Sequence, residues 1–236
     1  MRSYEAIPAG IRTAVGALPA SLLGRSGSIF YSGKEAFTAK SDLYVLGLNP
    51  GGSPTQASSA TIEAYLGRFR ELEKPWCEYS DECWEGAAPG TWGLQPRILH
   101  MLRELNLDPR MVPASNVVFV QSRGERELES EKAELLGACW AVHQAVIDNL
   151  SISTVLCFGA TAGAWVRDRL SAFELIDSFT ESNRRGWTSR NHCNADGRQV
   201  VTLTHPSRAD WRNPLADPTP LVMRAIARGK ERGSST

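Results

Sequence analysis

Two short stretches of the chain contain residue types that can bind and activate a small ligand. Asn49 stands in Gly47-Leu48-Asn49-Pro50-Gly51, directly after an apolar run at 43–46, and His205 stands in His205-Pro206-Ser207, after a second run at 199–204. A side-chain amide orients water or pairs with a polar edge, and an imidazole donates a hydrogen bond or transfers a proton. Glycine and proline are also ordinary turn residues, so the first motif alone is compatible with a simple strand exit.

Four short runs with strand-like composition are the elements that would position these residues. They span 43–46, 116–120, 154–158 and 199–204. Helical periodicity separates them, which favours crossover connections and a parallel sheet. The predicted fold class is α/β, a three-layer sandwich with a central four-stranded parallel sheet flanked by helices. Ligands bind such sheets at the carboxyl ends of the strands, where we expect Asn49, Asn116 or Gln121, Gly159 and His205 to meet.

The rest of the chain divides into helices and long polar segments. Apolar residues at helical spacing predict helices over 62–72, 93–107, 127–150, 160–170 and 219–228. We expect a single domain over 1–236, with its core at about 43–213, an N-terminal arm at 1–40 and a loop insertion at 74–91 that partly covers a pocket. The segment 181–197 is predicted to be an arginine-rich loop.

Composition restricts the classes of function. The 236 residues include 26 basic and 26 acidic ones, so a polyanionic partner would have to bind a local patch. The five cysteines are odd in number and lack a paired C-x-x-C arrangement, which favours a reducing, cytoplasmic location. No apolar run approaches the ~20 residues of a membrane span. We therefore expect a soluble protein that does not bind membranes.

Metal and cofactor patterns are weak or missing in the sequence. Cys77, Cys83, His192 and Cys193 match no standard zinc spacing, and they also do not match the cysteine pattern of an iron–sulfur cluster. Gly159-x-x-x-Gly163 lacks the G-x-G turn of a dinucleotide site. The sequence therefore predicts no metal and no cofactor.

With both motifs and the segments 115–123 and 155–162 in view, the chain resembles the uracil-DNA glycosylase superfamily. Members with an asparagine-type first motif have Gly-x-Asn-Pro-Gly after the first strand, and many have His-Pro-Ser after the last core strand. The resemblance covers about 43–213, in the right order. It implies the same fold and hydrolysis of the N-glycosidic bond of uracil, or of a related deaminated base, in DNA during base excision repair.

The resemblance implies roles at the reacting base. Asn49 would position the attacking water, and His205 would hydrogen-bond a uracil oxygen as negative charge builds on the leaving base. Asn116 would pair with the base edge and Trp92 would stack on the flipped base, where a packed loop tryptophan is the alternative. Two further base-binding positions are Gly47 and Gly51, because a bulkier residue at Gly51 would crowd the nucleotide.

The resemblance also implies a nucleic-acid surface. Ser207 would hold a phosphate, and Arg208, Trp211 and Arg212 would lie on the loop that enters the DNA, with Trp211 or Arg208 as the wedge. The implied partner is single- or double-stranded DNA, bound by a monomeric enzyme that is nucleoid-associated if bacterial. The arginines of the 181–197 segment would either touch phosphates or form a solvated face.

One departure from the family pattern leaves an alternative function open. Members commonly have an apolar residue soon after the serine of the second motif, whereas this chain continues Arg208-Ala-Asp-Trp-Arg. A non-catalytic or repurposed member of the same fold, which binds nucleic acid or a nucleotide without cleaving it, would keep the same site residues.

Overall fold

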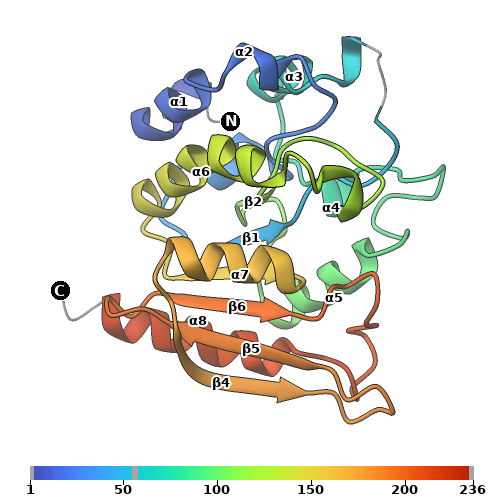
Figure 1. Ribbon diagram of the computed structural model, residues 1–236, viewed down its shortest axis with the longest axis vertical. Coiled ribbons are helices and arrows are strands. Elements are labelled where there is room, and N and C mark those ends of the chain that lie inside the picture. The colour runs from blue at the N-terminus through green and yellow to red at the C-terminus, as the bar shows by residue number, and fades with distance from the viewer. Residues whose placement is uncertain (1–2, 55–57, 234–236) are drawn as a thin grey trace.

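The computed structural model describes residues 3–54 and 58–233, and these form an α/β structure built on one mixed sheet (Figure 1). The strands are β1 (Leu43–Gly47), β2 (Ala114–Asn116), β3 (Thr154–Phe158), β4 (Glu174–Thr180), β5 (Thr188–Cys193) and β6 (Gln199–Leu203). Their spatial order is β2-β1-β3-β6-β5-β4. The first four in this order are parallel, whereas β5 is antiparallel to both β6 and β4.

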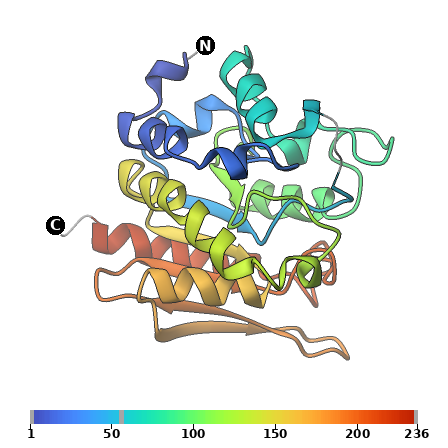
Figure 2. The same cartoon turned by 45° about the horizontal axis from the view of Figure 1, so that its top comes forward.

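Helices cover both faces of this sheet. They are α1 (Ala9–Gly16), α2 (Ala20–Leu23), α3 (Ile62–Glu71), α4 (Glu78–Asp81), α5 (Gln95–Glu104), α6 (Lys132–Asn149), α7 (Ala160–Arg169) and α8 (Thr219–Gly233). α6 and α7 lie on one face, with α1 packed on α6, and α5 and α8 lie on the other (Figures 1 and 2). The described part of the chain contains no helix that is long and apolar enough to cross a membrane.

The apolar run of β1 explains its central place in the sheet. Tyr44 and Leu46 belong to the core under α6 and α7, whereas Leu43 and Val45 belong to the core under α5 and α8. Side chains alternate between the two faces of a strand, so a strand covered on both faces must be apolar at every position. The α/β class expected from the sequence is therefore present.

The prediction of a purely parallel four-stranded sheet is wrong, because the β4–β5 hairpin adds two antiparallel strands. Part of the hairpin was predicted as the arginine-rich loop 181–197. β5 reads Thr-Ser-Arg-Asn-His-Cys and has no apolar alternation. Both faces of the hairpin contact a helix: Asp177 of β4 pairs with Arg224 and Arg228 of α8, and His192 of β5 lies 3.1 Å from Arg167 of α7. β5 makes its contacts through polar side chains, so it lacks the apolar pattern that identifies a buried strand.

The second predicted strand is also displaced. β2 ends at Asn116, where the predicted strand 116–120 begins. Residues 117–120 are buried and apolar, but their backbone bonds to the chain leaving β1: Val117 N donates to Gly47 O at 2.9 Å and Val118 N donates to Leu48 O at 2.8 Å. The displacement puts Asn116 at the carboxyl end of β2, beside Gly47 at the end of β1.

Candidate functional site

A cleft of about 1640 Å³ lies at the carboxyl ends of the parallel strands. The residues that follow β1, β3 and β6 line it, and so does Asn116 at the end of β2. Asn49, Asn116 and His205, predicted from separate parts of the sequence, therefore share one cleft. Its volume exceeds the roughly 300–1,000 Å³ of ordinary small-molecule pockets, so it has room for more than one nucleobase.

Asn49 is held in one orientation by its neighbours. Its Nδ2 donates to the carbonyl oxygen of Pro50 at 2.8 Å and to Oγ of Ser122 at 2.9 Å. The Ser122 hydroxyl in turn donates to the carbonyl oxygen of Gly124 at 3.0 Å, so it can only accept from Asn49. Both neighbours require an N–H from Asn49, which leaves its Oδ1 as an acceptor with no partner among the described residues.

Asn116 presents the opposite chemistry. Asn116 is 4 % exposed, and its buried Nδ2 has no well-formed hydrogen bond in the described structure, with the Tyr31 hydroxyl as a neighbouring polar group. Gly47 makes this position possible, because a Cβ on Gly47 would overlap Oδ1 of Asn116. The neighbouring Tyr31 also lines the cleft, and burial raises the pKa of its hydroxyl above the ordinary value, so the phenol stays protonated.

His205 is a neutral imidazole whose tautomer follows from its neighbours. The backbone N–H of Ser207 donates to Nδ1 at 3.1 Å, and Oγ of Ser207 lies 2.8 Å from the same nitrogen. Nδ1 therefore accepts, and the ring proton lies on Nε2, which has no partner among the described residues. Burial, and after it the charge of Arg208, lower the pKa of His205 below the ordinary value.

The other predicted cleft residues are placed as follows. Trp92 is 49 % exposed and lines the cleft, together with Gly51, Ser207 and Arg208. A Cβ on Gly51 would meet no protein atom within 4 Å, so its neighbours impose no limit on size there. The aromatic floor near His205 is Phe158, whose ring lies 6.4 Å from the imidazole.

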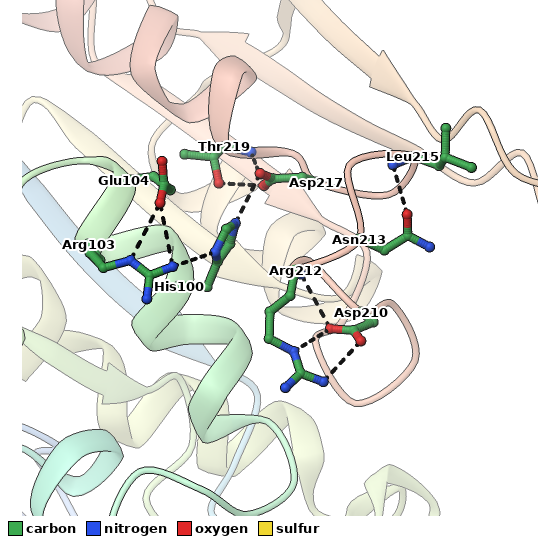
Figure 3. Close-up of polar contacts among 9 residues, drawn as sticks. All are labelled: His100, Arg103, Glu104, Asp210, Arg212, Asn213, Leu215, Asp217 and Thr219. Carbon is green, nitrogen blue, oxygen red and sulfur yellow. Dashed lines mark hydrogen bonds and ion pairs between the residues drawn. The ribbon is translucent and has the colours of Figure 1, made fainter.

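Trp211 corrects the predicted nucleic-acid surface, and Arg212 lies outside the cleft. Trp211 is completely buried and packs edge-on against Phe158 at 5.5 Å, so its side chain has no surface for DNA and the wedge prediction for it is wrong. Arg212 is exposed but does not line the cleft, and its guanidinium binds the Asp210 carboxylate at 2.9 and 3.0 Å (Figure 3). The indole of Trp211, which follows the second motif, fills part of the core under α8.

Arginines that form no direct ion pair line part of the cleft. They are Arg68, Arg123, Arg167, Arg190 and Arg208, none of which forms an ion pair with the described residues. Most arginines outside the cleft are paired, among them Arg25 with Glu131 and Arg110 with Asp81. These guanidinium groups can bind an anionic ligand, whereas the insertion contributes the carboxylates Glu78, Glu82 and Glu85 to the same cleft.

The 74–91 insertion forms an acidic and aromatic part of the same cleft. Trp84 Nε1 donates to Glu78 at 2.7 Å, and Trp76 Nε1 donates to Glu82 at 2.7 Å. Burial raises the pKa of Glu78 to about 7, and the Glu82 charge adds to the effect. The insertion was predicted to cover a pocket, and its residues do line the cleft.

Sequence reasoning missed several of these residues. Ser122 was placed beyond the second strand without a role, and its partnership with Asn49 depends on tertiary contact alone. Glu78, Arg167 and His192 carry no motif, and only the topology brings them to the cleft. The described residues contain no group of three or more His, Cys, Asp or Glu side chains arranged to hold a metal ion.

Comparison of the chain with models of known protein families finds no match, and a search of curated proteins finds no similar sequence.

Proposed function

We propose that the chain is a DNA glycosylase of the uracil-DNA glycosylase type, which hydrolyses the N-glycosidic bond of uracil or a related deaminated base. One observation carries the proposal. Asn49, Asn116 and His205 line the same cleft, and each presents a group that the described residues do not satisfy: an acceptor on Asn49, an N–H on Asn116 and an N–H on His205. Buried unpaired donors are rare, and at a cleft they favour a ligand that pairs with them.

The two donors match the edge of uracil. Uracil has two carbonyl oxygens flanking an N–H, so the Nδ2 of Asn116 can donate to one carbonyl while its Oδ1 accepts from the ring N–H. Cytosine replaces that carbonyl by an amino group, which would face the buried Nδ2 of Asn116 as a second donor. The second uracil carbonyl is left for the Nε2–H of His205.

The same geometry suits bond cleavage. Breaking the N-glycosidic bond develops positive charge on the sugar and negative charge on the departing base. The neutral His205 donates to the base oxygen where that negative charge builds, which stabilises the transition state more than the ground state. Oδ1 of Asn49 accepts a hydrogen bond from water and orients it toward the sugar carbon.

The surroundings of these residues suit an extruded nucleotide. The indole of Trp92 offers a face for stacking, and the cleft arginines offer positive charge to phosphates. Ser207 and Arg208 stay proposed phosphate contacts, and Arg208 stays the candidate wedge. DNA is thus the proposed partner, and extrusion of the base costs a few kcal/mol that these contacts offset.

The test is release of free uracil from a single-stranded oligonucleotide with one deoxyuridine, under enzyme excess, beside the same strand with deoxycytidine. Wild type is expected to release uracil and no cytosine. Asn116→Asp, which replaces the Nδ2 donor by an acceptor, should lose uracil release while it keeps its melting temperature within a few degrees. Tight binding of the oligonucleotide without release of any base would overturn hydrolysis and favour the binding-only alternative.

A further inference from the structure

A second group of unsatisfied donors lies in the cleft, away from Asn49 and Asn116. Arg167 of α7, His192 of β5 and Thr202 of β6 all line it. Nη1 of Arg167 lies 3.1 Å from Nε2 of His192. Because a guanidinium only donates, Nε2 of His192 accepts, and the neutral ring carries its proton on Nδ1. We call these three side chains the donor niche.

Each member of the donor niche has a buried polar atom with no partner in the described structure. The atoms are Nε of Arg167, Nδ1 of His192 and Oγ1 of Thr202, and the His192 side chain is only 7 % exposed. All three can donate a hydrogen bond. A buried donor without an acceptor destabilises the folded chain, and the described residues offer none of these atoms an acceptor. A ligand that supplies acceptors would satisfy all three atoms.

Charge specifies the kind of acceptor. Arg167 has no ion pair with the described residues, and neither has Arg190, which is paired with Thr202 across the β5–β6 ladder. The nearby Arg169 provides a contrast, since it leaves the cleft and stacks on the Trp165 ring at 4.3 Å. Donors and positive charge without any carboxylate partner match a phosphate, which offers only acceptors.

One member of the donor niche, Thr202, lies on β6, the strand that leads to His205. His205 follows Thr202 by three residues, just after β6 ends, a separation of up to about 10 Å at roughly 3.3 Å per residue. Helix α7 leaves room for Thr202 there, because Gly163 lies directly against its side chain and a Cβ on Gly163 would overlap Oγ1. A nucleic-acid strand with one base at His205 thus has its neighbouring backbone within reach of the niche.

We propose that Arg167, His192 and Thr202 form a phosphate-binding site, and that the phosphate belongs to the backbone of the bound nucleic-acid strand. The choice of a backbone phosphate rests on the proposed function, whereas phosphate binding itself does not. The site would fix the register of the strand relative to His205.

Binding of a uracil-free single-stranded oligonucleotide tests the proposal, because this measurement needs no catalysis. Arg167→Gln should weaken binding about tenfold at low salt and reduce the salt slope of log K by about 0.7, the loss of one phosphate contact. Arg169→Gln removes the same charge from the same helix and should bind like wild type. Equal affinity and slope for the two variants would overturn the proposal.

The variant Thr202→Val controls for an effect on folding. Valine has the shape of threonine without its unpaired hydroxyl, so this variant should keep or raise the melting temperature while it binds the oligonucleotide about fivefold more weakly. If folded Thr202→Val binds the oligonucleotide as tightly as wild type, the proposal that Thr202 contacts a phosphate is contradicted.

Inorganic phosphate distinguishes the source of the ligand. Millimolar phosphate should raise the melting temperature of wild type and not that of Arg167→Gln. If phosphate stabilises only wild type but wild type and Arg167→Gln bind the oligonucleotide equally well, the niche binds free phosphate. That result would overturn the proposal that the phosphate belongs to the nucleic-acid backbone. A lack of uracil release, by contrast, would overturn the proposed function and leave these binding results unaffected.

Discussion

His205 and His100 show how the cleft differs from the framework that holds it. Nε2 of His100 lies 3.1 Å from the Asp217 carboxylate and its Nδ1 lies 3.0 Å from Nη2 of Arg103, so both ring nitrogens have protein partners (Figure 3). In His205 only Nδ1 is engaged, by Ser207. The first histidine connects α5 to the segment before α8, whereas the Nε2–H of the second has no partner among the described residues.

The other two histidines follow the same division. His143 is completely buried, and its Nδ1 lies 2.8 Å from the Tyr44 hydroxyl and its Nε2 lies 3.2 Å from the Val117 carbonyl. Burial lowers the pKa of His143 to about 4. His192 has one engaged nitrogen and lines the cleft. Among the four histidines, the two that line the cleft thus keep one ring nitrogen without a partner among the described residues, whereas the two framework histidines have both nitrogens engaged.

The largest expected effect comes from replacing His205 by alanine, and His100→Ala serves as the comparison. His205→Ala should slow single-turnover uracil release by about 10²–10³-fold, because it removes a donor aimed at developing charge. His100→Ala should leave that rate within about twofold and instead lower the free energy of unfolding by about 1–3 kcal/mol, since Asp217 and Arg103 lose a partner. Equal losses of rate in both variants would remove the distinction between cleft and framework.

Gly47 and Gly51 allow a comparison of stability between two positions in the cleft. Gly47→Ala should destabilise the fold by about 1–3 kcal/mol, because its Cβ overlaps Oδ1 of Asn116 and forces that side chain aside. Gly51→Ala, where a Cβ meets open space, should change stability by less than about 0.5 kcal/mol. Urea denaturation measures both values, and a stable Gly47→Ala protein would mean that Asn116 is not held over Gly47.

Ser122 tests whether the orientation of Asn49 matters for turnover. Ser122→Ala should lower kcat by up to about tenfold with KM unchanged, because Asn49 loses one of two acceptors that fix its amide. Ser122→Thr, which keeps the hydroxyl, should recover most of the rate. The matched control is Ser41→Ala, whose hydroxyl binds the Leu43 carbonyl at the opposite end of β1. If Ser41→Ala also lowers kcat, the Ser122 effect does not arise from the orientation of Asn49.

The sequence predicted the parallel part of the sheet and which residues follow its strand ends, and particular residues explain where sequence reasoning stopped. β1 and β3 are buried on both faces, and continuous apolar runs identify such strands. β5 is largely buried but reads Thr-Ser-Arg-Asn-His-Cys, so it has no such signature. Asn49 and His205 directly follow strands, and short motifs were enough to single them out. The prediction for Trp211 was wrong because a tryptophan in a loop can pack into the core as easily as it can face solvent.

The residues that complete the site were beyond sequence reasoning for a related reason. Arg167 and His192 lie 25 positions apart and meet only because β5 turns back beside β6 under α7. Nothing local to either residue predicts that contact. The glycosylase activity and the roles of the predicted residues stay predictions until base release is measured.

The smallest expected effect is a shift in pH dependence. His205 must be neutral to donate from Nε2 while Nδ1 accepts, and burial with Arg208 lowers its pKa below the ordinary value of about 6.5. The rate of uracil release should therefore hold as the pH falls through 6.5 and decline only below it. Arg208→Gln removes a positive neighbour, so its decline should begin at higher pH by a fraction of a unit. A decline of the Arg208→Gln rate at lower pH than in wild type would contradict the assignment.

The central claim is that the cleft contains hydrogen-bonding groups left free for a nucleic-acid ligand. Long-range ¹H–¹⁵N spectra of the four histidine rings test it, with and without an uncleavable oligonucleotide that carries 2′-fluoro-deoxyuridine. We expect the resonances of Nε2 of His205 and Nδ1 of His192 to shift on binding, while those of both nitrogens of His100 and His143 stay unchanged. Shifts at His100 and His143 with none at His205 would contradict it.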